Sequence, residues 1–309
     1  MSKIAFVFPG QGSQQVSMGK DLFDNNDTAR DLYLKADEIS GLPLSEISFN
    51  GPADILKETQ YTQPALFVNS YILTQLIGDK IKADYSAGHS LGEYTAFAYG
   101  GAFDFETGVK LVTRRGELMK DAGDKQKGTM AALIGLTYEQ VYEICDKAEK
   151  ATNGKVCDAA NFNCPGQIVI SGDVEAVHKG MEIAKGEPYN CRLAKELPVS
   201  GAFHSRLMVP IADELRISIE GAGINDSKVA VFSNVEAEPV TAKAGIEQCL
   251  YRQLYSPVKW EDSIRNMVNE GVSKFYEIGS GKVLTGLIKK IHPDAELYNI
   301  STLEDIQNL

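Results

Sequence analysis

Apolar residues near the N-terminus form a continuous run, KIAFVF at 3–8, which ends at a Pro-Gly pair. A run without alternation is typical of a strand buried on both faces of a parallel sheet, and Pro-Gly indicates a tight loop. Helical patterns follow around 17–38 and 64–78, and a short strand is predicted at 83–87. The apolar spacing over 105–121 predicts an amphipathic helix. This first part of the chain therefore has the pattern of an α/β protein.

A different pattern occupies 128–198. Its strands and helices alternate in the order β-α-β-β-α-β, which is the ferredoxin-like arrangement. We predict strands at 129–136, 155–161, 167–172 and 189–199, and helices at 137–151 and 173–185. Thr137 is a suitable N-cap, because Gln140 follows three residues later. We interpret 128–198 as a small inserted subdomain, with 1–127 and 199–309 forming the large one.

The remaining chain returns to longer alternating elements. We predict helices at 205–221, 244–254, 261–270 and 282–291, and strands at 229–233 and 274–278. The fold class expected from the whole pattern is α/β.

Composition narrows the classes of function. The chain has 309 residues and a net charge of −11, with no long basic run, so we expect no nucleic-acid partner. The five cysteines are scattered without a C-x-x-C pair, which argues against a zinc ribbon and favours a reducing compartment. We find no signal-peptide pattern and no apolar run long enough to span a membrane. We therefore expect a cytoplasmic protein without a metal site.

The segment GHSLGEY, 88–94, has the pattern G-x-S-x-G. A predicted strand precedes it and a small, apolar helix pattern follows, so Ser90 is expected on a sharp turn between strand and helix. The N–H of Leu91 then lies near a helix N-terminus, where it can donate to an oxyanion. The motif predicts a nucleophilic serine.

A serine hydroxyl needs a base to attack. Of the four histidines, His204 in VSGAFHSRLM is the best candidate, because small residues and a turn surround it. His89 adjoins Ser90 and is expected to point elsewhere. His178 is expected on a solvated helix face, and His292 follows the last helix.

The third member of a triad has no obvious candidate. An acid between Ser90 and His204 would come from the small subdomain, where Asp158 and Asp173 are possible. A backbone carbonyl could orient the imidazole instead. An ordinary hydrolase is therefore disfavoured, although a serine esterase or thioesterase stays open as the alternative.

Seven ordered blocks give the chain a resemblance to the malonyl-CoA:acyl carrier protein transacylase family. The similarity covers nearly the whole chain, and it implies an α/β-hydrolase-like core with a ferredoxin-like insertion. The blocks are FPGQGSQ (8–14), GHSLGEY (88–94), RRGELM (114–119), NCPGQIVISG (163–172), GAFHS (201–205), RQLYSPVKW (252–260) and GSGKVLTGL (279–287).

The resemblance assigns roles residue by residue. Ser90 matches the acyl-accepting serine and His204 its general base. Leu91 and Gln11 match the residues whose backbone N–H groups form the oxyanion hole. The glycine loop around Gln11 lacks the Lys-Ser/Thr of a phosphate-binding P-loop, so we do not expect it to hold a nucleotide.

Two further residues complete the implied site. Arg115 matches the arginine that holds the free carboxylate of malonate, a pairing for which guanidinium geometry is well suited. Arg114 is expected in solvent, since one residue along a helix turns a side chain by about 100°. Gln253 matches the residue whose backbone carbonyl orients the histidine.

Several segments resemble the discrete acyltransferases that load polyketide synthases in trans: TQYTQPALFV (59–68), FDFETG (103–108) and VSGAFHSRLM (199–208). Phe203 resembles the malonyl-selecting form, in which a phenyl ring disfavours a methyl branch. The sequence does not separate fatty-acid supply from polyketide supply.

The expected activity is transfer of malonyl from malonyl-CoA to the phosphopantetheine thiol of an acyl carrier protein, without a cofactor of its own. A non-enzymatic scaffold that only binds the carrier protein is the rival from another class. We expect a monomer. Carrier docking to an acidic chain requires local basic patches, for which Lys195, Arg206 and Lys289-Lys290 are candidates.

Overall fold

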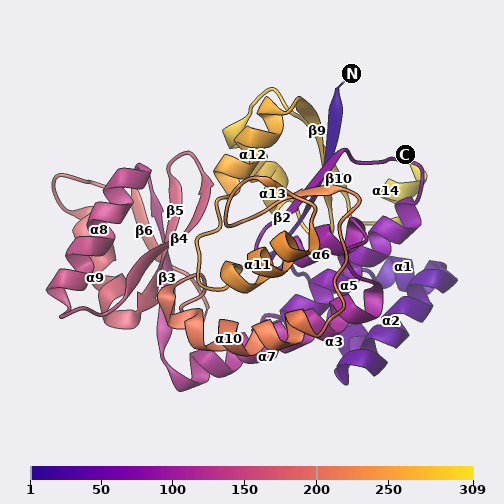
Figure 1. Ribbon diagram of the computed structural model, residues 1–309, viewed down its shortest axis with the longest axis horizontal. Helices are drawn as coiled ribbons and strands as arrows, with labels where there is room; N and C mark the ends of the chain where they lie inside the picture. The colour runs from indigo at the N-terminus through magenta and orange to yellow at the C-terminus, as the bar shows by residue number, and fades with distance from the viewer. Residues whose placement is uncertain (1, 200) are drawn as a thin grey trace.

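The computed structural model describes residues 2–199 and 201–309; Met1 and Ser200, the latter inside the segment 199–208, lie outside the described residues. Two sheets organise these residues. One has six strands in the order β10-β9-β1-β2-β7-β8, and the other has four in the order β4-β5-β3-β6. Figure 1 shows the four-stranded sheet to the left of the larger body. The predicted mixed α/β class with a parallel sheet is confirmed.

Five strands of the larger sheet are parallel, and the short β8 runs antiparallel to β7. The bounds are β1 Lys3–Phe8, β2 Tyr85–Gly88, β7 Ala230–Phe232, β8 Pro239–Val240, β9 Val272–Ile278 and β10 Glu296–Ile300. In the central β1, Phe6 and Phe8 join one hydrophobic cluster, while Ala5 and Val7 join another. Burial on both faces explains why this strand is an unbroken apolar run.

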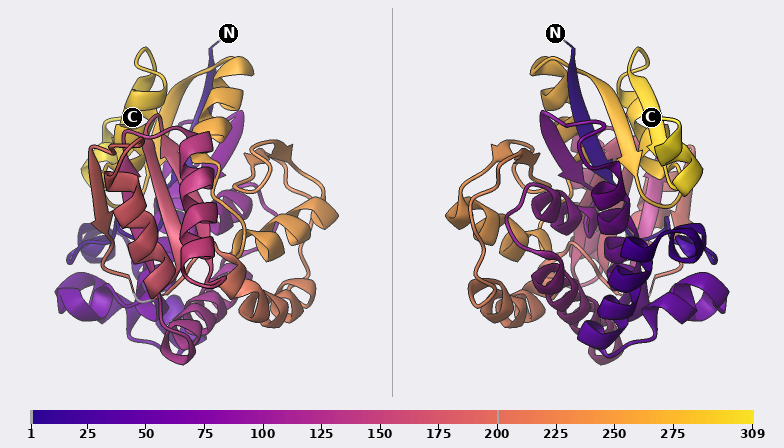
Figure 2. Two further views of the ribbon diagram at one scale, coloured as in Figure 1. Left: turned by 90° about the vertical axis from the view of Figure 1, so that its left-hand side faces the viewer. Right: turned by 90° about the vertical axis from the view of Figure 1, so that its right-hand side faces the viewer.

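Helices cover both faces of this sheet, as the two side views in Figure 2 show. One face carries α12 and α13, whose apolar residues pack with Ala5 and Val7. Most of the other helices pack on the cluster that contains Phe6 and Phe8. Their bounds are α1 Lys20–Asn25, α2 Asp27–Ser40, α3 Leu44–Asn50, α4 Ala53–Leu56, α5 Thr59–Ile77, α6 Gly92–Tyr99, α7 Phe105–Lys125, α10 Val209–Glu220, α11 Lys243–Gln253, α12 Trp260–Asn269, α13 Val283–Ile291 and α14 Leu303–Gln307.

The smaller sheet is antiparallel, and its chain order is β3-α8-β4-β5-α9-β6. The bounds are β3 Gly128–Ile134, α8 Tyr138–Ala151, β4 Cys157–Cys164, β5 Gln167–Asp173, α9 Val174–Lys185 and β6 Leu193–Glu196. Thr137 and Gln140 form the predicted capping box at the start of α8. The sheet is also joined to the larger body, because Phe162 N donates to Val258 O at 2.9 Å and Val258 N donates to Ala160 O at 2.8 Å.

Some predicted elements differ in extent. The helical pattern at 17–38 is two helices, because Asn26 adopts an extended conformation and its side chain caps α2 by accepting from Ala29 N. The helix predicted at 205–221 starts as a 3-10 turn at Arg206–Met208 and becomes α-helical at Val209. The last strand of the small sheet is shorter than the predicted 189–199.

Five short elements were absent from the prediction: α3, α4, β8, β10 and α14. All five span seven residues or fewer, which is too short for helical or strand periodicity to stand out. None of the described helices is both long and apolar enough to cross a bilayer.

Candidate active site

Ser90 lies at the turn between β2 and α6, where the motif predicted it. Its φ of 50° is left-handed, which is uncommon for a residue other than glycine. The flanking glycines are required by space: a Cβ on Gly92 would lie 2.0 Å from Phe8 O, and one on Gly88 would lie 1.8 Å from Gly92 C. The turn therefore presents the serine hydroxyl in a backbone shape that larger neighbours would prevent.

A buried asparagine holds this turn from the next strand. Ser90 N donates to Asn234 Oδ1 at 2.7 Å, and Asn234 Nδ2 donates to Gly88 O at 2.7 Å. Asn234 follows β7, which pairs with β2. The sequence analysis missed this residue, and a polar residue after a predicted strand of the same sheet was the available signal.

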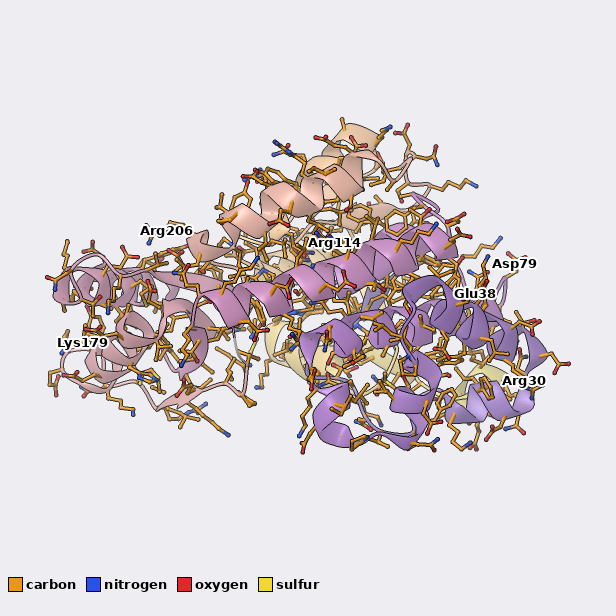
Figure 3. The ribbon with its side chains drawn as sticks, turned by 90° about the horizontal axis from the view of Figure 1, so that it is seen from below. Arg30, Glu38, Asp79, Arg114, Lys179 and Arg206 are labelled. Atoms are coloured by element: carbon orange, nitrogen blue, oxygen red, sulfur yellow. The ribbon has the colours of Figure 1, made fainter. Side chains whose placement is uncertain are left out.

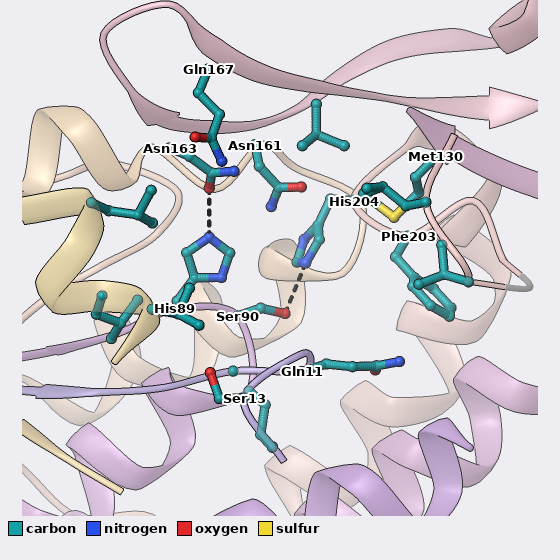
Figure 4. Close-up of a pocket in the computed structure, with 18 of the residues that line it drawn as sticks. Gln11, Ser13, His89, Ser90, Met130, Asn161, Asn163, Gln167, Phe203 and His204 are labelled. Carbon is teal, nitrogen blue, oxygen red and sulfur yellow. Dashed lines mark hydrogen bonds between the residues drawn. The ribbon is translucent and has the colours of Figure 1, made fainter. Parts of the chain in front are cut away.

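His204 contacts the serine directly, with Nε2 2.8 Å from Ser90 Oγ (Figure 4). Its Nδ1 lies 2.8 Å from the backbone carbonyl oxygen of Gln253. A carbonyl can only accept, so Nδ1 carries the proton and Nε2 is the acceptor for the serine hydroxyl. Burial, reinforced by the charge of Arg115, lowers the pKa of His204 to about 3, so the ring is neutral at pH 7.

The carbonyl of Gln253 thus occupies the position of the missing acid. The Asp158 carboxylate instead accepts from the backbone N–H of Arg206 at 2.9 Å and from the side chain of Arg206. Asp173 accepts from Val156 N at 2.7 Å. Neither carboxylate orients the imidazole.

The other three histidines lie elsewhere. His89 Nε2 is 2.8 Å from Asn163 Oδ1, so its ring turns away from the serine hydroxyl (Figure 4). His178 is half-exposed and contacts Glu196 at 3.1 Å. His292 follows α13 at its C-terminal end.

Gln11 and Leu91 line the same pocket as Ser90. Gln11 lies in the loop after β1, and Leu91 directly precedes α6. Within residues 2–199 and 201–309, neither backbone N–H has a hydrogen-bond partner. Two unpaired donors beside a serine hydroxyl are suited to a developing negative charge.

Arg115 is 1% exposed on α7 and points into the site. Its Nη2 donates to Ser90 Oγ at 3.1 Å and to Gln253 Oε1 at 2.8 Å, and its Nη1 donates to Gln63 Oε1 at 2.6 Å. Gln63, on α5, was missed by the sequence analysis because it is one of several polar residues at the start of this helix, and its spacing does not set it apart. Arg114 instead lies on the outer surface of α7 (Figure 3), 3.5 Å from Glu117 and from Glu214.

The guanidinium of Arg115 has no carboxylate within ion-pair distance in the described part of the chain. Its Nε–H is buried and has no hydrogen-bond partner there either. A buried cation without a direct ion pair is costly, and the cost falls when an anion binds against it. The site is therefore built to receive a negatively charged group next to Ser90.

Both sheets contribute to the pocket, which has a volume of about 210 Å³. Met119, Met130 and Phe203 form an apolar wall, and Phe203 is 6% exposed. Asn161, Asn163 and Gln167 bring amide groups from β4 and β5 to the opposite side, as Figure 4 shows.

Among the described residues, no group of three or more His, Cys, Asp or Glu side chains is placed to hold a metal ion. Of the predicted docking residues, Arg206 is ion-paired with Glu149 and Asp158 at the junction between the two sheets. Lys289 donates to Pro293 O and Lys290 lies 3.5 Å from Gln167 Oε1.

The fold and the site together define a mixed α/β enzyme with a serine–histidine pair, a buried arginine and two free backbone donors. A sequence model described as "Acyl transferase domain" matches residues 5–299. The chain belongs to this acyl transferase family, and the predicted acyltransferase class is confirmed.

Two curated relatives are similar over nearly their full length. The malonyl CoA-acyl carrier protein transacylase of Bacillus subtilis strain 168 is 44% identical over 308 residues, which cover 99% of this chain and 96% of the relative. The protein of the same name from Staphylococcus aureus strain MW2 is 41% identical over 307 residues, covering 99% and 98%.

Solved structures with the same fold carry names of the same kind. An acyl carrier protein S-malonyltransferase from Vibrio cholerae superposes with a TM-score of 0.94 at 38% identity, covering 99% of both chains. A malonyl-transacylase solved in complex with its type II polyketide synthase acyl-carrier protein gives a TM-score of 0.94 at 34% identity, covering 99% of this chain and 98% of that one.

Proposed function

We propose that this protein transfers a malonyl group from malonyl-CoA to the phosphopantetheine thiol of an acyl carrier protein, through a malonyl ester on Ser90. The observation that carries the proposal is the buried Arg115 guanidinium, which donates to Ser90 Oγ at 3.1 Å and has no carboxylate partner among the described residues. Malonyl is an acyl group that carries its own carboxylate. The full-length similarity to malonyl CoA-acyl carrier protein transacylases supports the same substrate.

In the first half-reaction, Ser90 Oγ attacks the thioester carbonyl and its proton passes to His204 Nε2. The carbonyl oxygen gains the negative charge and accepts from the N–H groups of Gln11 and Leu91. Removal of one such donor typically lowers the rate by about 10²–10³-fold. The C–S bond then breaks, CoA thiolate takes the proton from His204, and malonyl-Ser90 remains.

In the second half-reaction, the carrier thiol gives its proton to His204 and its sulfur attacks the Ser90 ester. The C–O bond breaks, and the proton returns to Ser90 Oγ. Each half-reaction leaves His204 neutral, which agrees with the low pKa of this ring in the resting protein. The scheme predicts ping-pong kinetics.

Arg115 binds the substrate through its charge. The malonyl carboxylate can accept from its Nε–H and form the direct ion pair that the guanidinium lacks, which fixes the acyl group beside Ser90. Phe203 narrows the pocket wall, so a methyl branch on the acyl chain is disfavoured, an effect typically worth about 1–3 kcal/mol.

The wider setting belongs to the same proposal. We infer an α/β-hydrolase-like large subdomain from 1–127 and 199–309, and a ferredoxin-like small subdomain from 128–198. We propose a cytoplasmic monomer without a cofactor of its own, which supplies fatty-acid or polyketide synthesis. The chain order β3-α8-β4-β5-α9-β6 of the small subdomain supports the ferredoxin-like description.

Intact-protein mass spectrometry tests the reaction. The protein is mixed with malonyl-CoA, and then with a phosphopantetheinylated carrier protein, with Ser90→Ala as the control. We expect a malonyl adduct on the wild type alone, which moves to the carrier when it is added. An adduct that decays to free malonate before carrier is added would favour the esterase or thioesterase alternative, and no adduct would favour a binding scaffold.

A further inference from the structure

One buried carboxylate in the site has no part in the scheme above. Glu93 is fully buried in the first turn of α6, three residues after Ser90. Its Oε1 accepts from Asn234 N at 2.7 Å, and its Oε2 accepts from Gln253 Nε2. A buried acid that contacts the neighbours of both Ser90 and Arg115 requires an explanation.

Gln253 is the residue through which these contacts converge. Its backbone carbonyl accepts from His204 Nδ1, and its side-chain oxygen accepts from Arg115 Nη2. Its Nε2 donates to Ser90 O at 2.8 Å and also to Glu93. One residue therefore contacts the base through its backbone carbonyl, and the substrate-binding arginine and the backbone of Ser90 through its side chain.

The orientation of the Gln253 amide follows from its partners. Ser90 O and the Glu93 carboxylate are both acceptors, so the NH₂ group must face them and the oxygen must face Arg115. Of the two, only Glu93 brings a negative charge, which makes its hydrogen bond the stronger. Glu93 also interacts electrostatically with Arg115 across this amide.

We propose that Glu93 is a positioning residue for acyl transfer: through Gln253 it keeps Arg115 and His204 aligned on Ser90. The inference rests on the proposed function for the identity of the substrate, whereas the contacts of Glu93 and Gln253 are independent of that function. If Glu93 loses its charge, one of its two oxygens becomes a donor that faces another donor. The Gln253 amide can then rotate, which turns its NH₂ group toward Arg115 and removes the acceptor that holds the guanidinium.

The proposal has a pH signature. Burial raises the pKa of Glu93 to about 7, against the opposing hydrogen bonds from Asn234 and Gln253 and the charge of Arg115. The other titratable groups near it are Tyr94 on its own helix and Cys249 on α11. Burial raises the pKa of Tyr94 to about 12 and that of Cys249 to about 11, so both stay neutral between pH 5 and 8.

Glu93 is therefore the group of this cluster that ionises near neutral pH, because His204 has a pKa of about 3. We expect malonyl acylation of Ser90 to fall as the pH drops through about 7, since protonation of Glu93 releases Gln253. A profile of kcat/KM reports groups of the free enzyme and free substrate. The substrate titrates identically with every variant, so a difference between two profiles belongs to the protein.

The decisive variant is Glu93→Gln, which has the shape of the protonated acid. We expect kcat/KM for malonyl acylation at pH 8 to fall about 10- to 100-fold, the loss of one charge-assisted hydrogen bond. The acid limb near pH 7 should disappear, while the melting temperature stays within a few degrees of the wild type or rises. Glu261→Gln is the matched control, because it neutralises a mostly buried carboxylate that pairs with Arg265 away from Ser90.

Two readouts separate this inference from the proposed function. Labelling of Ser90 by a fluorophosphonate needs Ser90 and His204 but no malonyl group. Acylation by malonyl-CoA needs Ser90, His204 and Arg115. If malonyl-CoA never acylates the wild type, the proposed substrate is wrong, but the labelling profile still tests Glu93. Profiles of Glu93→Gln that superimpose on the wild type in rate and pH dependence would overturn the inference.

A second variant applies if Glu93→Gln does not fold. Gln253→Met keeps the backbone carbonyl for His204 and a side chain of similar length, but removes the amide between Glu93 and Arg115. We expect the same loss of malonyl acylation and of the acid limb. An unchanged rate and an unchanged limb in this variant would equally exclude the relay through Gln253.

Discussion

The two sheets divide the work of the pocket unequally. The six-stranded, mostly parallel sheet provides Ser90 and Gln11 in the turns directly after β2 and β1. The four-stranded antiparallel sheet provides amides, Asn161 and Asn163 among them, but no described side chain of it contacts Ser90 Oγ. Turns at the carboxyl ends of parallel strands expose backbone N–H groups and side chains to one crevice, whereas a sheet face offers a covering surface.

The comparison also shows where charge is tolerated. Arg115 and Glu93 are both buried on helices of the larger body. In the smaller body, Lys155 pairs with Glu175 and Glu196 contacts His178, and all four side chains lie at the surface. The proposed reaction scheme therefore draws all of its groups from the larger body, and the predictions below test that division from the largest effect to the smallest.

Removal of the base should have the largest effect. We expect His204→Ala to lower kcat for malonyl transfer by about 10⁴- to 10⁶-fold, as in other serine enzymes that lose their histidine. Steady-state transfer with a radiolabelled malonyl group measures this loss. His178→Ala, on α9 of the smaller body, should keep wild-type activity. A comparable loss there would contradict the division of roles.

Removal of the buried cation should have a large effect that depends on the substrate. We expect Arg115→Ala to lower kcat/KM for malonyl-CoA about 10²-fold, since it deletes a charge-assisted pair with the carboxylate. Acetyl-CoA lacks that carboxylate, so its transfer should change several-fold at most. Parallel assays with the two thioesters decide the point, and equal losses would exclude a carboxylate-binding role.

Changes on the smaller sheet should affect binding only. We expect Asn161→Ala to raise the KM for malonyl-CoA up to about 10-fold with little change in kcat, because one neutral hydrogen bond contributes about 1 kcal/mol. Initial rates over a range of malonyl-CoA concentrations separate the two constants. A fall in kcat with an unchanged KM would mean that this sheet takes part in the chemistry.

The contact between the two sheets should have the smallest effect. Arg206 is 57% exposed at its side chain and pairs with Glu149 and Asp158. Solvent screens such pairs, so Arg206→Ala should reduce the free energy of unfolding by only about 0.2–1 kcal/mol. Urea denaturation followed by circular dichroism measures the change. A loss of several kcal/mol would show that the two bodies are more tightly coupled than this comparison implies.

The sequence alone predicts those parts of the candidate site that have a local pattern. Ser90 follows from G-x-S-x-G between a strand and a helix, and the ordered blocks then lead to His204, Arg115 and Gln253. In contrast, Asn234, Gln63 and the role of Glu93 depend on contacts between distant segments. Asn234 meets Glu93 across 141 positions of the chain, and no local spacing records such a contact.

The fold, like the site, was predictable only where the sequence has a local pattern. Long apolar runs such as β1 and long amphipathic helices such as α7 were located from periodicity, because tertiary packing requires that pattern over many residues. Short elements were not, and Asn26 divided a helix that periodicity alone extended to 38. Capping by one polar side chain outweighs a weak periodic signal at such a position.

The return of the chain from β6 to α10 has a consequence for protein engineering. His204 follows this crossing, its N–H donates to Leu254 O at 3.0 Å, and two residues later Arg206 N donates to Asp158. A chimaera that exchanged only 128–198 with a relative would replace the carboxylate while retaining the arginine. The junction of such a chimaera is better placed after Arg206. The exchanged segment then contains both partners of the contact between 158 and 206, and the position of His204 relative to Ser90 is kept.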